Sequence, residues 1–250
     1  MNEDICLLKK FNINNYFDYP YPYIIIYNAL EEDIYNYLAK NYPSDKIIFE
    51  SNLNNINKKM KENTRYQIKG FKCINNDNID NLWKRFVEYH TSKEFYIKVM
   101  KIFNKEIDDT EVLIRKLSKD NPKDKILLDC QIGINTPNSI KSTVRDAHID
   151  SSEEIYAGLF YMKDENDLCD ENNGGNLDIY EINNKNNDDF FLNSGKNLIN
   201  KNIIKKFKTI NYSKNTFVLF LNSDKAVHGV TERQPNNISR KLINIIAEKL

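Results

Sequence analysis

One short segment sets the expectations for the whole chain: Ser142-Thr143-Val144-Arg145-Asp146-Ala147-His148-Ile149-Asp150. It ends in a His-x-Asp motif, which places an imidazole and a carboxylate two residues apart. We expect this segment to be a strand, in which residues i and i+2 point to the same face. His148 and Asp150 would then hold one metal ion from a rigid backbone. Taken alone, the motif more often marks a polar strand face near a turn than a metal site.

The third ligand has few candidates because the chain contains only three histidines. His90 falls between two expected helices, where we expect a capping or solvent-exposed side chain. His228 follows the apolar, strand-like run 216–221, and enough sequence separates it from Asp150 for several strands. We therefore predict that His228 comes from the far side of a closed double sheet and completes the set of two histidines and one carboxylate that non-haem Fe(II) sites use.

Length and composition favour one domain spanning residues 1–250, because 250 residues with 40% hydrophobic content can build one sizeable core. Lys plus Arg and Asp plus Glu both number 36, so no net field draws the protein to nucleic acid or to an anionic membrane. The start of the chain does not resemble a signal peptide, and no apolar run is long enough to span a membrane. We expect a soluble cytoplasmic protein with a small-molecule partner.

The four cysteines are widely spaced and form no Cys-x-x-Cys pair. Reduced, structural thiols are therefore expected, and no zinc site is indicated.

Residues 1–122 are expected to form a helical support region with one short strand. The apolar run 23–27 fits a buried strand, and apolar residues at three- and four-residue steps predict helices over 30–41, 79–87, 91–103 and 111–117. Thr91 to Glu94 reads as a capping box. The Asn-rich stretch 50–78 carries no clear pattern.

Residues 123–250 are expected to form a jelly-roll core. The period changes here from helical to strand-like, and we predict strands over 126–134, the His148 segment, 155–162, 175–182, 207–212, 216–221 and 241–247. Many short strands in one half predict a mainly β, α+β fold: a double-stranded β-helix, cupin-like, with the N-terminal helices packed on one outer face.

Arg240 opens the last expected strand and shares a face with Leu242, Asn244 and Ile246. A guanidinium on an otherwise apolar strand needs a buried anion, because an unpaired charge there costs several kcal/mol. A carboxylate that accepts two hydrogen bonds is its natural partner.

These residues together resemble the Fe(II)- and 2-oxoglutarate-dependent oxygenase superfamily, particularly its prolyl-hydroxylase-like branch. The resemblance covers roughly residues 125–250 and rests on His148-x-Asp150, on His228 followed by Gly229-Val230, and on Arg240 about one strand later. Gly174-Gly175-Asn176-Leu177 resembles the turn into a core strand of that branch, and Leu159-Phe160-Tyr161-Met162 resembles the strand whose tyrosine helps to hold 2-oxoglutarate.

The resemblance implies that Fe(II), 2-oxoglutarate and O₂ are the cofactor and cosubstrates. His148, Asp150 and His228 would be the catalytic iron ligands. Arg240 would bind the distal carboxylate of 2-oxoglutarate with help from Tyr161. Gln131 and Asn135 are further candidates for contacts with cosubstrate or substrate, or for ordinary hydrogen bonding at a strand edge. Because Asp150 is present, hydroxylation is expected rather than the halogenation of relatives that lack this carboxylate.

Three polar residues are candidates for substrate contact: Arg145, Asp146 and Arg233. Strand alternation would put Asp146 on the face of His148 and Arg145 on the opposite face, unless a bulge intervenes. A salt bridge for Arg145 and an exposed-loop position for Arg233 are the alternatives. A rim with charges of both signs favours a small polar, zwitterionic or anionic metabolite. Residues 183–202 would form either a lid or a tolerated insertion.

Three functions remain open from the sequence. The first is a hydroxylase of a small polar metabolite that converts 2-oxoglutarate to succinate and CO₂. The second is a prolyl hydroxylase acting on a peptide or protein, and the third is a non-catalytic, cupin-like jelly roll that binds a metal or ligand. Arg240 separates the first two from the third, because metal binding alone needs no buried cation. The sequence leaves the substrate and the oligomeric state open.

Overall fold

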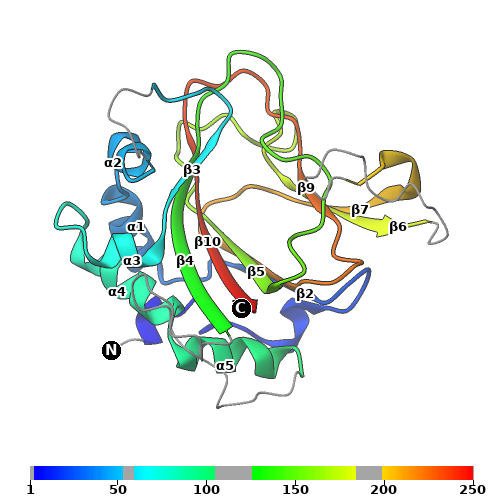
Figure 1. Ribbon diagram of the computed structural model, residues 1–250, viewed down its shortest axis with the longest axis horizontal. Coiled ribbons are helices and arrows are strands. Elements are labelled where there is room, and N and C mark those ends of the chain that lie inside the picture. Colours follow the sequence, from blue (N-terminus) through cyan, green and yellow to red (C-terminus); the bar gives the residue numbers. More distant parts are fainter. Residues whose placement is uncertain (1–2, 53–58, 105–125, 184–198, 250) are drawn as a thin grey trace.

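The protein contains two antiparallel sheets that pack face to face. The computed structural model describes residues 3–52, 59–104, 126–183 and 199–249. Figure 1 shows helices α1 to α4 along one side of the larger sheet and the smaller sheet, with β6, β7 and β9, on the other side. This arrangement is the expected double-stranded β-helix with supporting helices. No helix within the described ranges is long and apolar enough to cross a membrane.

The larger sheet has the strand order β1-β2-β8-β5-β10-β4-β3, and each neighbouring pair is antiparallel. Its long central strands are β10 and β4, whose residues pair in register from Arg240 opposite Asn135 to Lys249 opposite Ile126. In sequence order the strands are β1 (Tyr16–Phe17), β2 (Tyr23–Tyr27), β3 (Arg65–Ile68), β4 (Ile126–Asn135), β5 (Glu154–Tyr161), β8 (Thr216–Leu221) and β10 (Arg240–Lys249).

The smaller sheet has the order β7-β6-β9 and covers the inner face of the larger one. It consists of β6 (Leu177–Ile182), β7 (Ile204–Ile210) and β9 (His228–Val230). Leu177 and Ile179 of β6 enter one apolar cluster with Leu159 of β5 and Phe220 of β8. The space between the sheets is therefore filled by side chains. The polar site described below lies in one part of this space.

The helices cover the outer face of the larger sheet, where they share a cluster with outward residues such as Phe160, Ile243 and Ile245. Side-chain caps define three of their starts, because Ser44, Asp80 and Ser92 accept hydrogen bonds from Ile47 N, Leu82 N and Phe95 N, respectively. The helices are α1 (Glu32–Lys40), α2 (Asp45–Glu50), α3 (Gly70–Ile74), α4 (Asn81–His90) and α5 (Lys93–Ile102), and short 3₁₀ turns lie at Glu3–Ile5, Ile13–Asn15 and Lys201–Ile203.

Most expected elements are present, and the differences are local. The predicted strand 207–212 runs from Ile204 to Ile210 instead. Ser92, rather than Thr91, caps α5, and Glu94 pairs with Lys98 rather than closing a capping box. The patternless stretch contributes β3 and α3, which the sequence did not indicate. The predicted helix 111–117 lies outside the described residues, and so do residues 184–198, most of the segment predicted to be a lid or a tolerated insertion.

The N-terminal half is more than a helical support, because it supplies strands to both edges of the larger sheet. β2 pairs with β8, and β3 pairs with β4. The site described below therefore draws residues from both halves of the chain.

His90 is neither exposed nor a helix cap, which corrects the sequence-based expectation. It is 1% exposed, at the end of α4. Leu7 N donates to its Nε2 at 3.3 Å, and its Nδ1 lies 2.8 Å from the carbonyl oxygen of Phe86. Burial lowers the pKa of His90 to about 3, so the ring is a neutral core residue at physiological pH.

Candidate active site

His148 and Asp150 lie on a loop, so the predicted strand over this segment is wrong. The loop pairs with β9 at an isolated bridge, in which His148 N donates to His228 O at 2.8 Å and His228 N donates to His148 O at 3.0 Å. Val230 N of β9 also donates to Arg145 O at 2.9 Å. The backbones approach closely here, since a Cβ on Gly229 would lie 2.9 Å from Ala147 N. The bridge, rather than strand periodicity, holds the two histidines side by side.

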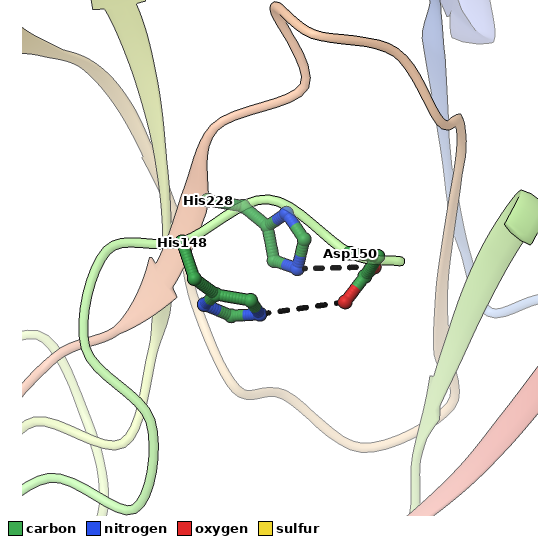
Figure 2. Close-up of side chains that lie close together, drawn as sticks. All are labelled: His148, Asp150 and His228. Atoms are coloured by element: carbon green, nitrogen blue, oxygen red, sulfur yellow. Dashed lines mark ion pairs between the residues drawn. The ribbon is translucent and has the colours of Figure 1, made fainter. Parts of the chain in front are cut away.

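Figure 2 shows the imidazoles of His148 and His228 directed at the carboxylate of Asp150. The Nε2 atoms of His148 and His228 each lie 3.5 Å from a different oxygen of Asp150. One ligand atom from each of the three residues lies within 4.8 Å of the others. All three side chains are buried, so this group is compact enough to hold one metal ion.

The hydrogen bonds of the rings select the tautomer that binds metal. His148 Nδ1 lies 2.6 Å from the Asp146 carbonyl oxygen, and His228 Nδ1 lies 2.9 Å from that of Ala226. A carbonyl oxygen can only accept, so Nδ1 carries the proton in both rings and Nε2 presents its lone pair. His148 Nε2 is buried and has no hydrogen-bond partner among the described residues.

Electrostatics favour the same protonation state. Burial lowers the pKa of His148, and burial together with the facing His148 lowers the pKa of His228 to about 3. Burial alone would raise the pKa of Asp150, but His228, His148 and Arg145 hold it below its usual range. Two neutral imidazoles and one carboxylate are the donor set that a divalent iron site requires.

A second group of polar atoms surrounds Arg240, which is 1% exposed. Its Nε donates to Gly175 O at 2.8 Å, and its guanidinium carbon lies 5.0 Å and 4.3 Å from the ring centroids of Tyr161 and Tyr212. Within the described ranges, Arg240 Nη1, Tyr161 Oη and Asn135 Nδ2 are buried without hydrogen-bond partners, and no carboxylate pairs with Arg240.

The cavity at the triad holds about 450 Å³ of space, including its open mouth. Apolar walls come from both sheets and include Leu159, Leu177 and Phe220. Phe220 also packs against His228, with ring centroids 4.5 Å apart. The polar lining outside the triad consists of Arg65, Arg145, Glu154 and Asn244.

Arg145 lines this cavity, so the prediction that it points away from His148 is wrong. Its Nη1 lies 3.2 Å from Asp150 Oδ1. The alternation argument failed because residues 143–147 do not form a regular strand. The same irregularity turns Asp146 outward, where its carboxylate pairs with Lys201 at 2.7 Å.

Two other candidates lie away from the cavity. Arg233 is fully buried, and its Nη atoms donate to the carbonyl oxygens of Thr136 and Ile238, so it ties connecting loops together. Gln131 reaches the cavity only through Asn244, whose Nδ2 donates to Gln131 Oε1 at 3.2 Å. Roles for these residues in cosubstrate or substrate binding stay predictions.

Arg65 and Glu154 are cavity residues that the sequence reading missed. Arg65 begins β3, where alternation of polar and apolar residues over only four positions was the sole signal. Its Nε donates to Asn135 Oδ1 at 3.2 Å. Burial and the neighbouring Arg240 and Arg145 lower the pKa of Arg65 to about 10. Burial and the nearby Asp150 raise the pKa of Glu154 to about 8.

No family model and no curated protein sequence matches this chain. Solved structures do match. A prolyl-4-hydroxylase from Pseudomonas putida superposes with a TM-score of 0.50 and 11% identity, over 91% of this chain and 92% of that one. A prolyl 4-hydroxylase from Phytophthora capsici superposes with a TM-score of 0.50 and 12% identity, over 91% of this chain but only 58% of its own.

At such low identity the comparisons establish the fold, and the chemistry rests on the triad. Both agree with the resemblance seen in the sequence. This chain has the double-stranded β-helix fold of these prolyl hydroxylases, and within it a buried group of two histidines and one carboxylate that is compact enough to hold a metal ion.

Proposed function

We propose that this protein is an Fe(II)- and 2-oxoglutarate-dependent hydroxylase that acts on a small polar metabolite and converts 2-oxoglutarate to succinate and CO₂. One observation carries the proposal: Arg240, a buried cation without a carboxylate partner among the described residues, lies on the same strand and the same face as Asn244, which lines the cavity of the triad. A metal-binding jelly roll without turnover would need the triad and not Arg240.

The residues fit both absent partners. Neutral His148 and His228 with anionic Asp150 would hold Fe(II), since both Nε2 lone pairs face the carboxylate. The unpartnered Arg240 Nη1 and Tyr161 Oη would donate to the distal carboxylate of 2-oxoglutarate. A charge-assisted hydrogen bond of this kind contributes about 1.5–3 kcal/mol.

Bound iron would supply the activation of O₂ that couples decarboxylation of 2-oxoglutarate to oxidation of a C–H bond. The chain itself supplies position and exclusion of water. Arg240 fixes one end of the cosubstrate, and the apolar side chains of Leu159, Leu177 and Phe220 keep water from the cavity beside the triad. The Nδ1 hydrogen bonds keep both imidazoles oriented.

A prolyl hydroxylase acting on a peptide is the second candidate, and the fold likeness to two prolyl hydroxylases favours it. The charged lining of the cavity favours a small charged metabolite instead, because an internal prolyl residue offers no charge to two arginines and a glutamate. The balanced net charge gives no reason to propose a nucleic-acid or membrane partner.

Anaerobic titration of the protein with Fe(II) and then 2-oxoglutarate tests the proposal. We expect one iron per chain and a weak visible charge-transfer band, which His148→Ala, Asp150→Ala and His228→Ala should each abolish. Asp178→Ala is the matched control, because Asp178 of β6 is as buried as Asp150, at 5%, but contacts Thr209 and Tyr180 instead of the triad. Retention of stoichiometric iron and of the band in all three triad variants would refute the assignment.

A further inference from the structure

Arg65 and Arg145 stand between the triad and the protein surface. Both line the cavity that contains His148, Asp150 and His228. Both also line an adjoining surface hollow, together with Asn63, Thr64 and Val144. The Arg145 side chain is 40% exposed and Arg65 is partly buried, so a molecule that moves from this hollow toward the triad meets two guanidinium groups.

The charge of these two arginines is poorly compensated. Arg65 donates through Nε to the neutral amide of Asn135, and no carboxylate in the described part of the chain pairs with it. Arg145 pairs through Nη1 with Asp150 alone. A cation held by the triad would share the charge of Asp150, so less negative charge would then be available to Arg145. Each guanidinium can donate two parallel hydrogen bonds, and the two groups have little negative charge beside them. Together they suit the binding of a ligand carboxylate.

A carboxylate lines the same cavity. β5 contains a bulge, because Ala247 pairs with Tyr156 while the next residue, Glu248, pairs with Glu154. The skipped residue, Ile155, packs against the helix-side core, and Glu154 lines the cavity. The bulge thus aims a carboxylate inward, as bulges near functional sites often do. No side-chain hydrogen bond or ion pair of Glu154 occurs within the described ranges.

We propose that the substrate is a zwitterion of the amino-acid type, whose carboxylate binds Arg65 and Arg145 and whose ammonium group binds Glu154. The proposal rests on the proposed function for its chemistry, but it concerns a different group of residues. Arg240 would serve the cosubstrate, and the triad would serve the metal. Two arginines and one glutamate remain. A free amino acid offers its carboxylate to the arginines, and its ammonium group would favour the ionised form of Glu154, whose pKa burial raises to about 8.

The same lining disfavours other ligands. A phosphate ester without an amine would leave Glu154 without a cationic partner, and its negative charge would disfavour the ionised form of Glu154 further. An internal peptide residue has neither free group, so it would leave the arginines and the glutamate without partners after displacing their water. Both ligand classes are therefore useful in the test.

The experiment measures binding without turnover. The Fe(II) protein with 2-oxoglutarate is kept free of O₂ and is mixed with individual L-amino acids. Each amino acid is compared with its C-terminal amide, with its N-acetyl derivative and with a tripeptide that contains it internally; glucose 6-phosphate represents phosphate esters. Dissociation constants come from shifts in melting temperature, and succinate formation after admission of O₂ is recorded separately.

We expect at least one free amino acid to bind about tenfold or more tightly than its amide, its N-acetyl derivative or the tripeptide. Arg65→Gln and Arg145→Gln should each raise the dissociation constant of the amino acid about tenfold, so that the amino acid no longer binds more tightly than its amide. Glu154→Gln should erase its advantage over the N-acetyl derivative. Arg85→Gln is the matched control, since Arg85 is exposed on α4 and does not line the cavity.

Three results would overturn the proposal while the charge-transfer band still forms: binding of no free amino acid, equal binding of acid and amide, or preference for the tripeptide or the phosphate ester. A loss of 2-oxoglutarate affinity in Arg65→Gln as large as the loss for the amino acid would also overturn it, because Arg65 would then serve the cosubstrate. Absence of the band itself indicates failure of the proposed function instead.

Discussion

The two faces of the larger sheet are built from alternate residues of the same strands, yet they differ in kind. On the outer face, Phe160, Ile243 and Ile245 pack against the helices in an apolar cluster. On the inner face, the neighbouring positions include Tyr161, Arg240 and Asn244, and the first two carry buried polar atoms without partners in the described structure. Adjacent residues of one strand thus serve stability and binding separately.

Unpartnered buried groups are unusual because each costs roughly 1–3 kcal/mol relative to a satisfied one. The helix-covered face contributes enough apolar burial to tolerate them. The difference teaches that the inner face combines an apolar cluster with buried polar groups that fit the proposed ligands, whereas the outer face is apolar and packs against the helices. Substitutions on the two faces should therefore affect different measurements.

The largest effect is expected on the outer face. Phe160→Ala removes a ring that is 0% exposed and contacts Tyr35 and Phe86, so it should lower the free energy of unfolding by about 3–5 kcal/mol. Denaturant unfolding followed by circular dichroism measures the loss. At low temperature, where the variant is folded, its iron stoichiometry should equal that of the wild type. A change below about 1 kcal/mol would contradict the role given to this face.

A fall in pH should lower the free energy of unfolding through His90, which lies beside Phe86 in the same region of the core. The pKa of His90 is about 3 in the folded protein and about 6.5 when unfolded, so the unfolded state binds the proton first as the pH falls. The contribution of His90 is complete above pH ~6.5 and should decrease by about 2 kcal/mol at pH ~5.

The measurement compares wild type and His90→Gln, because Gln does not titrate. The slope of unfolding free energy against pH between about 5 and 7 should be smaller in the variant. Identical slopes would mean that His90 does not stay neutral in the folded state. His148 and His228 contribute equally to both proteins and cancel in the difference.

On the inner face, Arg240→Met should act on the cosubstrate. We expect the dissociation constant of 2-oxoglutarate to rise about tenfold or more, which corresponds to about 1.4 kcal/mol, while iron still binds. Isothermal titration of the metal-loaded protein without O₂ measures both. Lys241→Met is a useful comparison, because Lys241 follows Arg240 and pairs with Asp164 instead. Equal effects of the two substitutions would move the carboxylate site away from Arg240.

The smallest effect is expected at Tyr161, next to Phe160. Tyr161→Phe removes only a buried hydroxyl that has no described partner, so stability should be unchanged or slightly higher. The affinity for 2-oxoglutarate should fall severalfold, as expected for one neutral hydrogen bond of about 1 kcal/mol. A stability loss as large as that of Phe160→Ala, with unchanged cosubstrate affinity, would remove the distinction between the two faces.

Periodicity predicted the regular elements well, because their side-chain pattern reflects which face is buried. The strand at 23–27 and the strand at 216–221 have the expected bounds, and the long strand that begins at Arg240 lies where the sequence placed it. The His148 loop did not follow the pattern. It is held by a bridge and further hydrogen bonds to β9, and such pairing between distant segments leaves no periodic trace in either of them.

The composition of the site was readable only in part. A His-x-Asp motif, a distant histidine and a late arginine have chemistry that is rare on apolar strands, so they were identifiable by residue type. Arg65 and Glu154 were not, because charged residues are common throughout this chain. Their place in the cavity depends on an edge pairing of β3 with β4 and on a bulge in β5.

The sequence by itself determined the double-stranded β-helix, the apolar outer face and the three residues able to hold a metal, since hydrophobic period and side-chain chemistry are local properties. Only the tertiary structure decided that His90 lies in the core, that Arg145 faces the triad rather than the opposite side, and that Arg65 and Glu154 share its cavity. These facts depend on which distant backbones pair and where a strand slips by one residue. Such pairings are set by the packing of the whole chain, so no single segment encodes them.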